Sequence, residues 1–289
     1  MNFLPRTDLA VEDNENERKK KTTEYEFNNV IIEKIVLDSD DAKKYKKTEG
    51  VYYSLTTDAI VNIDHDEGSN VSMAIVKVLE DIYEEYNLTQ DSYILILGLG
   101  NDEITPDSLG PKVVKNIFVT KHLFDLGQLE QGLGIIGAIA PGVMGQTGIE
   151  TSDIIKALVK KTKPELVLVI DALASRSLHR VNRTIQISTA GINPGSGVGN
   201  KRKEISYKTL GVPVVAIGVP TVVDIASIFY DLKNFFNEEE NGYDVRGSLI
   251  ESDLNYMVTS KDIDEMMNMM SDIISKAINV SIHNLEMYE

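Results

Sequence analysis

The sequence predicts an α/β fold with a mostly parallel central sheet and helices on both of its faces. Two observations support this prediction. Strand-like and helical segments alternate from about residue 71 onward, and several strands are apolar at every position, as in residues 166–170, Leu-Val-Leu-Val-Ile. Strands that are apolar on both faces are typical of parallel sheets buried between layers of helices.

The part of the chain before this alternation has β character. Residues 30–37, 52–55 and 59–63 have the composition of short strands. We therefore expect a β-rich N-terminal portion over residues 30–65. Residues 12–22 are highly charged, and we expect them to be solvated.

The later elements follow from periodicity and from helix-start signals. A helix is expected over residues 71–86, where apolar side chains recur at helical spacing. Pro111 fits the first turn of the next helix, because the amide hydrogen that proline lacks is not needed there. Thr151 is the expected N-cap of a further helix. We expect strands over residues 93–97, 134–140, 166–170, 184–188 and 212–217, and helices over residues 152–161, 221–236 and 262–283.

Composition narrows the function classes. The 289 residues, of which 42% are hydrophobic, suffice for one large α/β domain. With 45 acidic against 29 basic residues the net charge is −16, so we expect no direct contact with nucleic acid, which needs a basic face. The absence of cysteine excludes disulfides, thiolate catalysis and cysteine-based zinc sites. No signal peptide or membrane span is expected, which favours a cytoplasmic setting.

Residues 7–12, Thr-Asp-Leu-Ala-Val-Glu, have the form of a cleavage site carried by the protein itself. A small hydroxyl residue and an acid, Asp8, precede a large apolar residue, Leu9. Alanine, one further residue and a second acid follow. The alternative is a frayed acidic N-terminus. In either case we expect an exposed and weakly packed segment, because the charged stretch after it is too polar to anchor it.

Two aspartates are placed where functional groups gather in parallel sheets, beyond the carboxyl ends of strands. Asp171 directly follows the strand over residues 166–170, and Asp107 lies in the loop after the strand over residues 93–97. Two neighbouring carboxyl groups can share one proton and divide the acid and base roles of hydrolysis. From position alone, Asp171 could equally cap a helix over residues 172–178, and Asp107 the helix at Pro111.

Three blocks together resemble the germination protease family of spore-forming bacteria. They are residues 7–12, residues 105–111 (Thr-Pro-Asp-Ser-Leu-Gly-Pro) and residues 169–176 (Val-Ile-Asp-Ala-Leu-Ala-Ser-Arg). The resemblance runs from Arg6 to about Asp224 and resumes near Asn255. It implies a zymogen endopeptidase of the spore core that initiates breakdown of small acid-soluble spore proteins. It also implies a fold like that of the hydrogenase-maturation peptidases.

The resemblance implies roles for particular residues. Asp107 and Asp171 match the family's proposed catalytic pair, which makes the enzyme an atypical aspartic protease without an Asp-Thr-Gly or Asp-Ser-Gly motif. Cleavage after an acid and before a large apolar residue would fall between Asp8 and Leu9. It would leave a propeptide, residues 1–8, and a single peptidase domain, residues 9–289. A homotetramer without a bound cofactor or metal is implied. The insertion of longer members is short here, residues 237–256, so its role is in doubt.

Three other functions stay open. A dinucleotide-binding enzyme would use Gly98 and Gly100, but the third glycine of the fingerprint is replaced by Glu103. A metal-dependent endopeptidase would need ligands, and the four histidines show no ligand spacing; His122 and His179 are expected on the surface. A non-enzymatic acidic binding module is the third.

Two features near the expected site have both a functional and an ordinary interpretation. The glycine-rich loops over residues 98–101 and 191–200 could direct backbone amides at an oxyanion, or could simply be tight turns. The basic cluster over residues 201–204 could hold acidic substrate residues, or could be a solvated turn. Glu150 and Asp153 are expected in the first turn of a helix.

Overall fold

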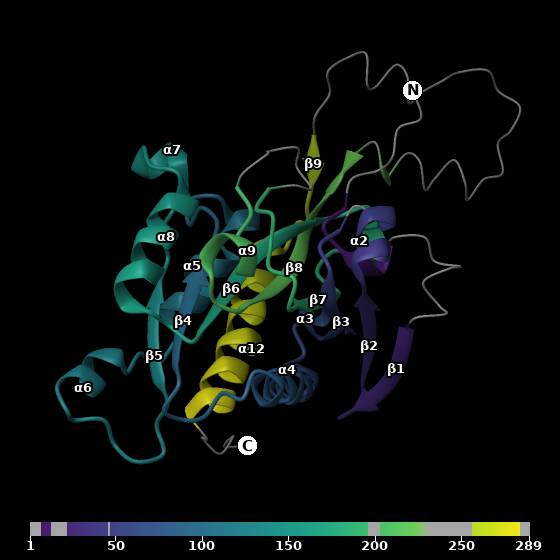
Figure 1. Ribbon diagram of the computed structural model, residues 1–289. Helices are drawn as coiled ribbons and strands as arrows, with labels where there is room; N and C mark the ends of the chain where they lie inside the picture. Colours follow the sequence, from purple (N-terminus) through teal and green to yellow (C-terminus); the bar gives the residue numbers. More distant parts are fainter. Residues whose placement is uncertain are drawn as a thin grey trace, which may run out of the picture.

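The computed structural model describes residues 7–12, 22–45, 47–195, 203–225, 227–228 and 256–283. Within these residues the strands join one central sheet in the order β1-β2-β3-β7-β8-β6-β4-β5, with β9 paired to β8 (Figure 1). The strands are β1 (Thr22–Phe27), β2 (Val30–Leu37), β3 (Gly50–Thr56), β4 (Tyr93–Gly98), β5 (Ile135–Ile139), β6 (Leu166–Ser175), β7 (Thr184–Ser188), β8 (Val214–Asp224) and β9 (Met257–Val258).

The sheet has a parallel half and an antiparallel half. Strands β8, β6, β4 and β5 pair in parallel. Strands β1, β2, β3 and β7 pair antiparallel, and β7 joins the two halves through its antiparallel pairing with β8. The predicted α/β class is therefore confirmed, and the β-rich N-terminal portion extends the same sheet.

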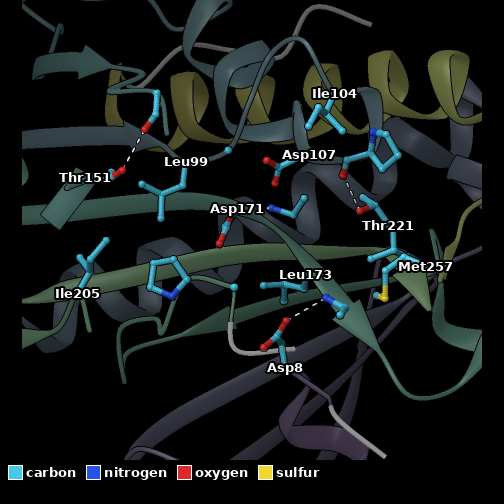
Figure 2. A pocket seen from close by; sticks show the side chains of 18 of the residues that line it. Asp8, Leu99, Ile104, Asp107, Thr151, Asp171, Leu173, Ile205, Thr221 and Met257 are labelled. Atoms are coloured by element: carbon cyan, nitrogen blue, oxygen red, sulfur yellow. Dashed lines mark hydrogen bonds between the residues drawn. The ribbon is translucent and has the colours of Figure 1, made fainter. Parts of the chain in front are cut away.

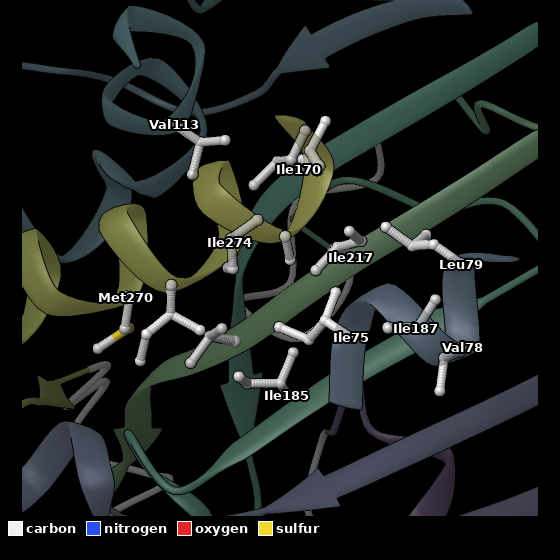
Figure 3. Close-up of a cluster of buried hydrophobic side chains, with 14 of the residues drawn as sticks. Ile75, Val78, Leu79, Val113, Ile170, Ile185, Ile187, Ile217, Met270 and Ile274 are labelled. Carbon is white, nitrogen blue, oxygen red and sulfur yellow. The ribbon is translucent and has the colours of Figure 1, made fainter. Parts of the chain in front are cut away.

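Helices cover both faces of the sheet. They are α2 (Ser39–Tyr45), α3 (Ala59–Asn62), α4 (His65–Glu85), α5 (Leu109–Lys115), α6 (Lys121–Asp125), α7 (Met144–Thr147), α8 (Thr151–Thr162), α9 (Tyr207–Leu210) and α12 (Ile263–His283). Short 3-10 turns are η1 (Ala10–Glu12), η2 (Thr105–Asp107) and η3 (Leu178–Arg180). Helices α4 and α12 pack on one face, and Ile75, Ile274 and Ile217 meet there in the largest apolar cluster (Figure 3).

The opposite face of the sheet is covered in two parts. Over the parallel half, α8 packs against β6 through Ile155 and Val169. Over the antiparallel half, residues 7–12 lie against β2 and β3, so this short segment covers sheet surface that a helix would otherwise cover. Alternation along the strands then decides which side chains face the segment. Asp171 in β6 and Gln186 in β7 lie on this face, because their neighbours Ile170 and Ile187 point into the other cluster.

The structure corrects two predicted elements. Residues 59–62 form helix α3 instead of a strand, because the Thr57 hydroxyl accepts a hydrogen bond from the Ala59 amide and starts the turn. Residues 221–224 end β8 instead of beginning a helix. Strand β6 continues to Ser175, and its last residues pair with Val222 and Val223. Most of the remaining predicted helix, up to residue 236, lies outside the described residues.

Three further differences concern single elements. Strand β1 was not predicted; its exposed, charged residues gave no apolar signal, and pairing with β2 forms it. Asp171 lies inside β6 and caps no helix. Thr151 is the first residue of α8, and its hydroxyl donates to the Gly142 carbonyl instead of capping the helix.

The shortened insertion region, residues 237–255, lies outside the described residues. In the part of the chain that the structure describes, none of the helices has the length and apolarity that crossing a membrane requires.

Candidate active site

A cavity of about 340 Å³ opens where the carboxyl ends of β4 and β6 meet the segment over residues 7–12. The structure places Asp107 and Asp171 in the lining of this one cavity, and Asp8 lines it as well. Figure 2 shows the three carboxyl groups around the same space. The volume falls in the range of about 300–1,000 Å³ that is typical of ligand sites.

Asp171 is held by the sheet. Asp171 is an interior residue of β6, and its side chain is buried. Its Oδ1 accepts a hydrogen bond of 3.0 Å from the Ala172 amide. In the neighbouring strand β8 the residue in register is Gly218, which has no side chain to fill the space. A Cβ at Gly218 would lie 2.4 Å from the Leu173 side chain. Pairing with β8 therefore fixes the backbone of Asp171, and the Ala172 amide orients its carboxyl group.

Asp107 ends the 3-10 turn η2 and is half-buried. Its Oδ2 accepts a 2.9 Å hydrogen bond from the Asn101 amide, and its carbonyl oxygen accepts from the same amide. Gly100 has φ +108°, and a Cβ there would lie 2.0 Å from the Asp107 carbonyl oxygen. Because Gly100 has no side chain, the Asp107 carbonyl oxygen can lie close to it and the chain can turn there. The Asn101 amide donates to Asp107, so it is not free to bind an oxyanion. In the first glycine-rich loop the tight-turn interpretation is the one that the structure supports.

Strand β8 fixes the loop that carries Asp107. The Thr221 hydroxyl donates a 2.6 Å hydrogen bond to the Pro106 carbonyl, and the Thr259 hydroxyl donates to the Thr221 carbonyl. Since Asp171 lies in β6, which pairs with β8, both aspartates are positioned through the same pair of strands.

The expectation that residues 7–12 are exposed is wrong. Leu9 is fully buried, with Ala10 and Val11 buried beside it. They pack against apolar side chains of the sheet and of the turn after β7, namely Ile35, Leu37, Tyr52, Leu173 and Ala190. The charged stretch after the segment is not needed to anchor it, because these apolar residues and their backbone contacts do so.

The segment is also hydrogen-bonded to β6. The Asp8 amide donates to the Ala174 carbonyl at 3.0 Å, and the Ala174 amide donates to Asp8 Oδ2 at 2.9 Å. Lys47 donates from Nζ to the Thr7 carbonyl at 2.8 Å. The peptide bond between Asp8 and Leu9 is therefore held in place beside the cavity.

Gln186 is a site residue that the sequence did not reveal. Its Oε1 accepts a 2.7 Å hydrogen bond from the Ala10 amide, and its Nε2 lies 3.4 Å from the Asp8 carbonyl oxygen, a long hydrogen bond. The side-chain amide thus spans both sides of Leu9. A single glutamine has no motif around it here. Residues 184–188 read Thr-Ile-Gln-Ile-Ser, so Gln186 is one of three alternating polar residues and nothing in the sequence sets it apart.

The other predicted residues lie at the margin. Lys203 lines the cavity and pairs with exposed Asp153 at 2.9 Å, an ion pair that raises the pKa of Lys203 and lowers that of Asp153. Lys201, Arg202 and residues 196–200 of the second glycine-rich loop lie outside the described residues. His122 and His179 are exposed. Among the described residues, no three His, Asp or Glu side chains are grouped as metal ligands would be.

Comparison with known proteins defines the class as a protease. The family model described as germination protease matches residues 5–250. The chain is 39% identical to the germination protease of Bacillus thuringiensis subsp. konkukian strain 97-27, over 98% of this chain and 94% of the relative. It is 43% identical to that of Oceanobacillus iheyensis, over 91% of this chain and 78% of the relative. The chain belongs to the germination protease family.

Comparison with solved structures matches the chain to the NiFe hydrogenase maturation protease HycI from Thermococcus kodakarensis KOD1. It is 18% identical, covers 70% of this chain and 98% of its own, and superposes with a TM-score of 0.35. The alignment with the Bacillus thuringiensis relative spans 346 positions, more than the 289 residues of this chain. That relative therefore has residues without a counterpart here.

Proposed function

We propose that this germination protease is a zymogen endopeptidase whose catalytic pair is Asp107 and Asp171. The observation that carries the proposal is that both aspartates line one cavity together with Asp8, the acid of the internal cleavage-site sequence. Family membership supports the protease activity, and the shared cavity supports the choice of these two residues.

The proposed chemistry divides acid and base work between the two carboxyl groups. One carboxylate takes a proton from a water molecule, whose oxygen attacks the carbonyl carbon of the acidic residue before the cleaved bond. The other carboxyl group gives its proton to the amide nitrogen of the following residue as the carbon–nitrogen bond breaks. Two neighbouring carboxyl groups suit this division because they do not ionise together easily and can share one proton.

The proposed substrates are small acid-soluble spore proteins, cut between an acid and a large apolar residue. The buried Leu9 side chain supports the apolar preference, because residues 7–12 show how such a sequence fits against β6. We extend the proposal to self-processing between Asp8 and Leu9, to a homotetramer and to action in the cytoplasm of the spore core. The last two extensions rest on the family resemblance alone.

Peptide cleavage tests this function. The matured protein is incubated with a peptide that contains Thr-Glu-Phe-Ala-Ser-Glu, with and without a chelator. We expect cleavage between Glu and Phe that is insensitive to the chelator. Cleavage that the chelator abolishes would favour the metal-dependent alternative, and an intact peptide would favour a binding module.

A further inference from the structure

The carboxylate of Glu12 is bound at the end of β6. Its Oε1 accepts hydrogen bonds from the Ser175 hydroxyl at 2.7 Å and from the Ser177 amide at 2.9 Å. Its Oε2 accepts from the Arg176 amide at 2.8 Å and from the Thr7 hydroxyl. Two consecutive backbone amides and a hydroxyl that converge on one carboxylate form an anion-binding site, and such charge-assisted hydrogen bonds are strong.

This carboxylate site has a fixed relation to the proposed cleavage point. Glu12 is the fourth residue after the Asp8–Leu9 bond. Glu12 is the last residue of the 3-10 turn η1, which brings its side chain back to the end of β6. One continuous stretch, residues 171–177, therefore carries Asp171, the Ala174 contacts to Asp8 and the site for Glu12.

The surroundings of Glu12 contain basic side chains that favour a negative group. A neighbouring cavity of about 540 Å³ is lined by two acidic residues, Glu12 and Glu33, and by Arg176, His179 and Arg180. The Nε of Arg176 is buried and has no hydrogen-bond partner among the described residues. An unpaired guanidinium nitrogen is costly when buried, and a ligand carboxylate would satisfy it.

We propose that Ser175 and the amides of Arg176 and Ser177 form a specificity subsite for an acidic side chain. That side chain is the fourth residue after the cleaved bond of a protein substrate. The proposal rests on the endopeptidase function proposed above. In the uncleaved chain Glu12 occupies this subsite, so substrate cannot use it until residues 9–12 have left the sheet.

Two matched peptides test the subsite. They contain Thr-Glu-Phe-Ala-Ser-Glu and Thr-Glu-Phe-Ala-Ser-Gln, which differ only in the charge of the fourth residue after the cleaved bond. For the matured wild type we expect kcat/KM to be about tenfold higher for the Glu peptide, because the Gln peptide cannot accept as many charge-assisted hydrogen bonds. In Ser175→Ala the preference should fall to about threefold, and Ser175→Thr, which keeps the hydroxyl, should restore it.

The peptide results distinguish a failure of the proposed subsite from a failure of the proposed endopeptidase function. Equal kcat/KM for the two peptides, or a preference unchanged in Ser175→Ala, overturns the subsite while the endopeptidase stands. If the wild type cleaves neither peptide, the endopeptidase and the subsite are both overturned.

A second measurement tests whether Glu12 of the enzyme occupies the subsite. In the matured Glu12→Gln variant, KM for the Glu peptide should fall severalfold, since the chain's own N-terminus competes less well for the site; an unchanged KM contradicts self-occupancy.

Discussion

Asp8 and Ala174 are joined by two hydrogen bonds, one from the Asp8 amide to the Ala174 carbonyl and one from the Ala174 amide to the Asp8 carboxylate. Ala174 lies three residues after Asp171 in β6. The acid of the internal cleavage sequence is therefore attached to the strand that carries one member of the proposed catalytic pair.

Replacing either aspartate of the pair by asparagine should remove peptidase activity and leave the fold intact. Asparagine has nearly the same shape but cannot exchange a proton, and general acid–base catalysis contributes about 10²- to 10⁴-fold. We expect a loss of at least about 100-fold in peptide cleavage for Asp107→Asn and Asp171→Asn, with an unchanged circular dichroism spectrum.

The matched control is Asp81→Asn, which removes an exposed ion pair with Lys77 on α4 and should leave turnover near normal. A folded Asp107→Asn or Asp171→Asn protein with near-normal turnover would exclude that residue from the catalytic pair.

Removing the Gln186 amide should slow self-processing. Gln186→Met keeps the length of the side chain and loses both hydrogen bonds to the segment, so we expect processing to slow by about tenfold. Gel electrophoresis of the purified full chain over time measures the rate. Ser54 is the residue in register with Gln186 in β3, and Ser54→Ala is the control that should process normally. If both variants process alike, Gln186 does not position the bond.

Shortening Leu9 should destabilise the uncleaved chain. Because Leu9 is fully buried, Leu9→Ala should lower the free energy of unfolding by about 2–5 kcal/mol. Leu178, which is about half exposed, provides the control Leu178→Ala with little expected change. Urea unfolding of a catalytically inactive full chain measures both. Equal stability of the two variants would mean that the segment is not packed on the sheet.

Stability should fall as the pH drops below about 6.5 because of His283. Burial lowers the pKa of His283 in the folded protein, while its Nε2 bonds the Phe118 carbonyl and its buried Nδ1 has no partner among the described residues. The unfolded chain therefore binds more protons in this range, so the free energy of unfolding falls with falling pH. Urea unfolding at pH 7.5 and 5.5 should show a smaller pH effect in His283→Gln than in the wild type. An equal pH effect in both would exclude His283 as the cause.

The sequence predicted the apolar strands of the sheet well, and the segments that become strands only through pairing less well. Residues 93–97 and 166–170 were recognisable because an apolar strand buried on both faces depends little on its neighbours. Residues 22–27 and 221–224 became strands through pairing with β2 and β6, which no local pattern records. Residues 59–62 form a helix, which begins beside the hydrogen bond from the Ala59 amide to the Thr57 hydroxyl. The β-branched residues Ile60 and Val61 had indicated a strand instead.

The candidate site divides in the same way. Asp107 and Asp171 stand in sequence blocks of their own, so a resemblance could find them. The contributions of Gln186 and Ser175 arise from contacts with residues more than 160 positions away, Ala10 and Glu12. A run of only three apolar residues, 9–11, was too short to indicate that the segment is buried.

We propose above all that the chain cleaves its own Asp8–Leu9 bond with Asp107 and Asp171. N-terminal sequencing of the purified full chain after incubation, beside the Asp171→Asn variant, tests it most directly. We expect the wild type to acquire a new N-terminus at Leu9 and the variant to keep its original start. A mature start at any other residue, or a variant that matures at Leu9 at the wild-type rate, would contradict it.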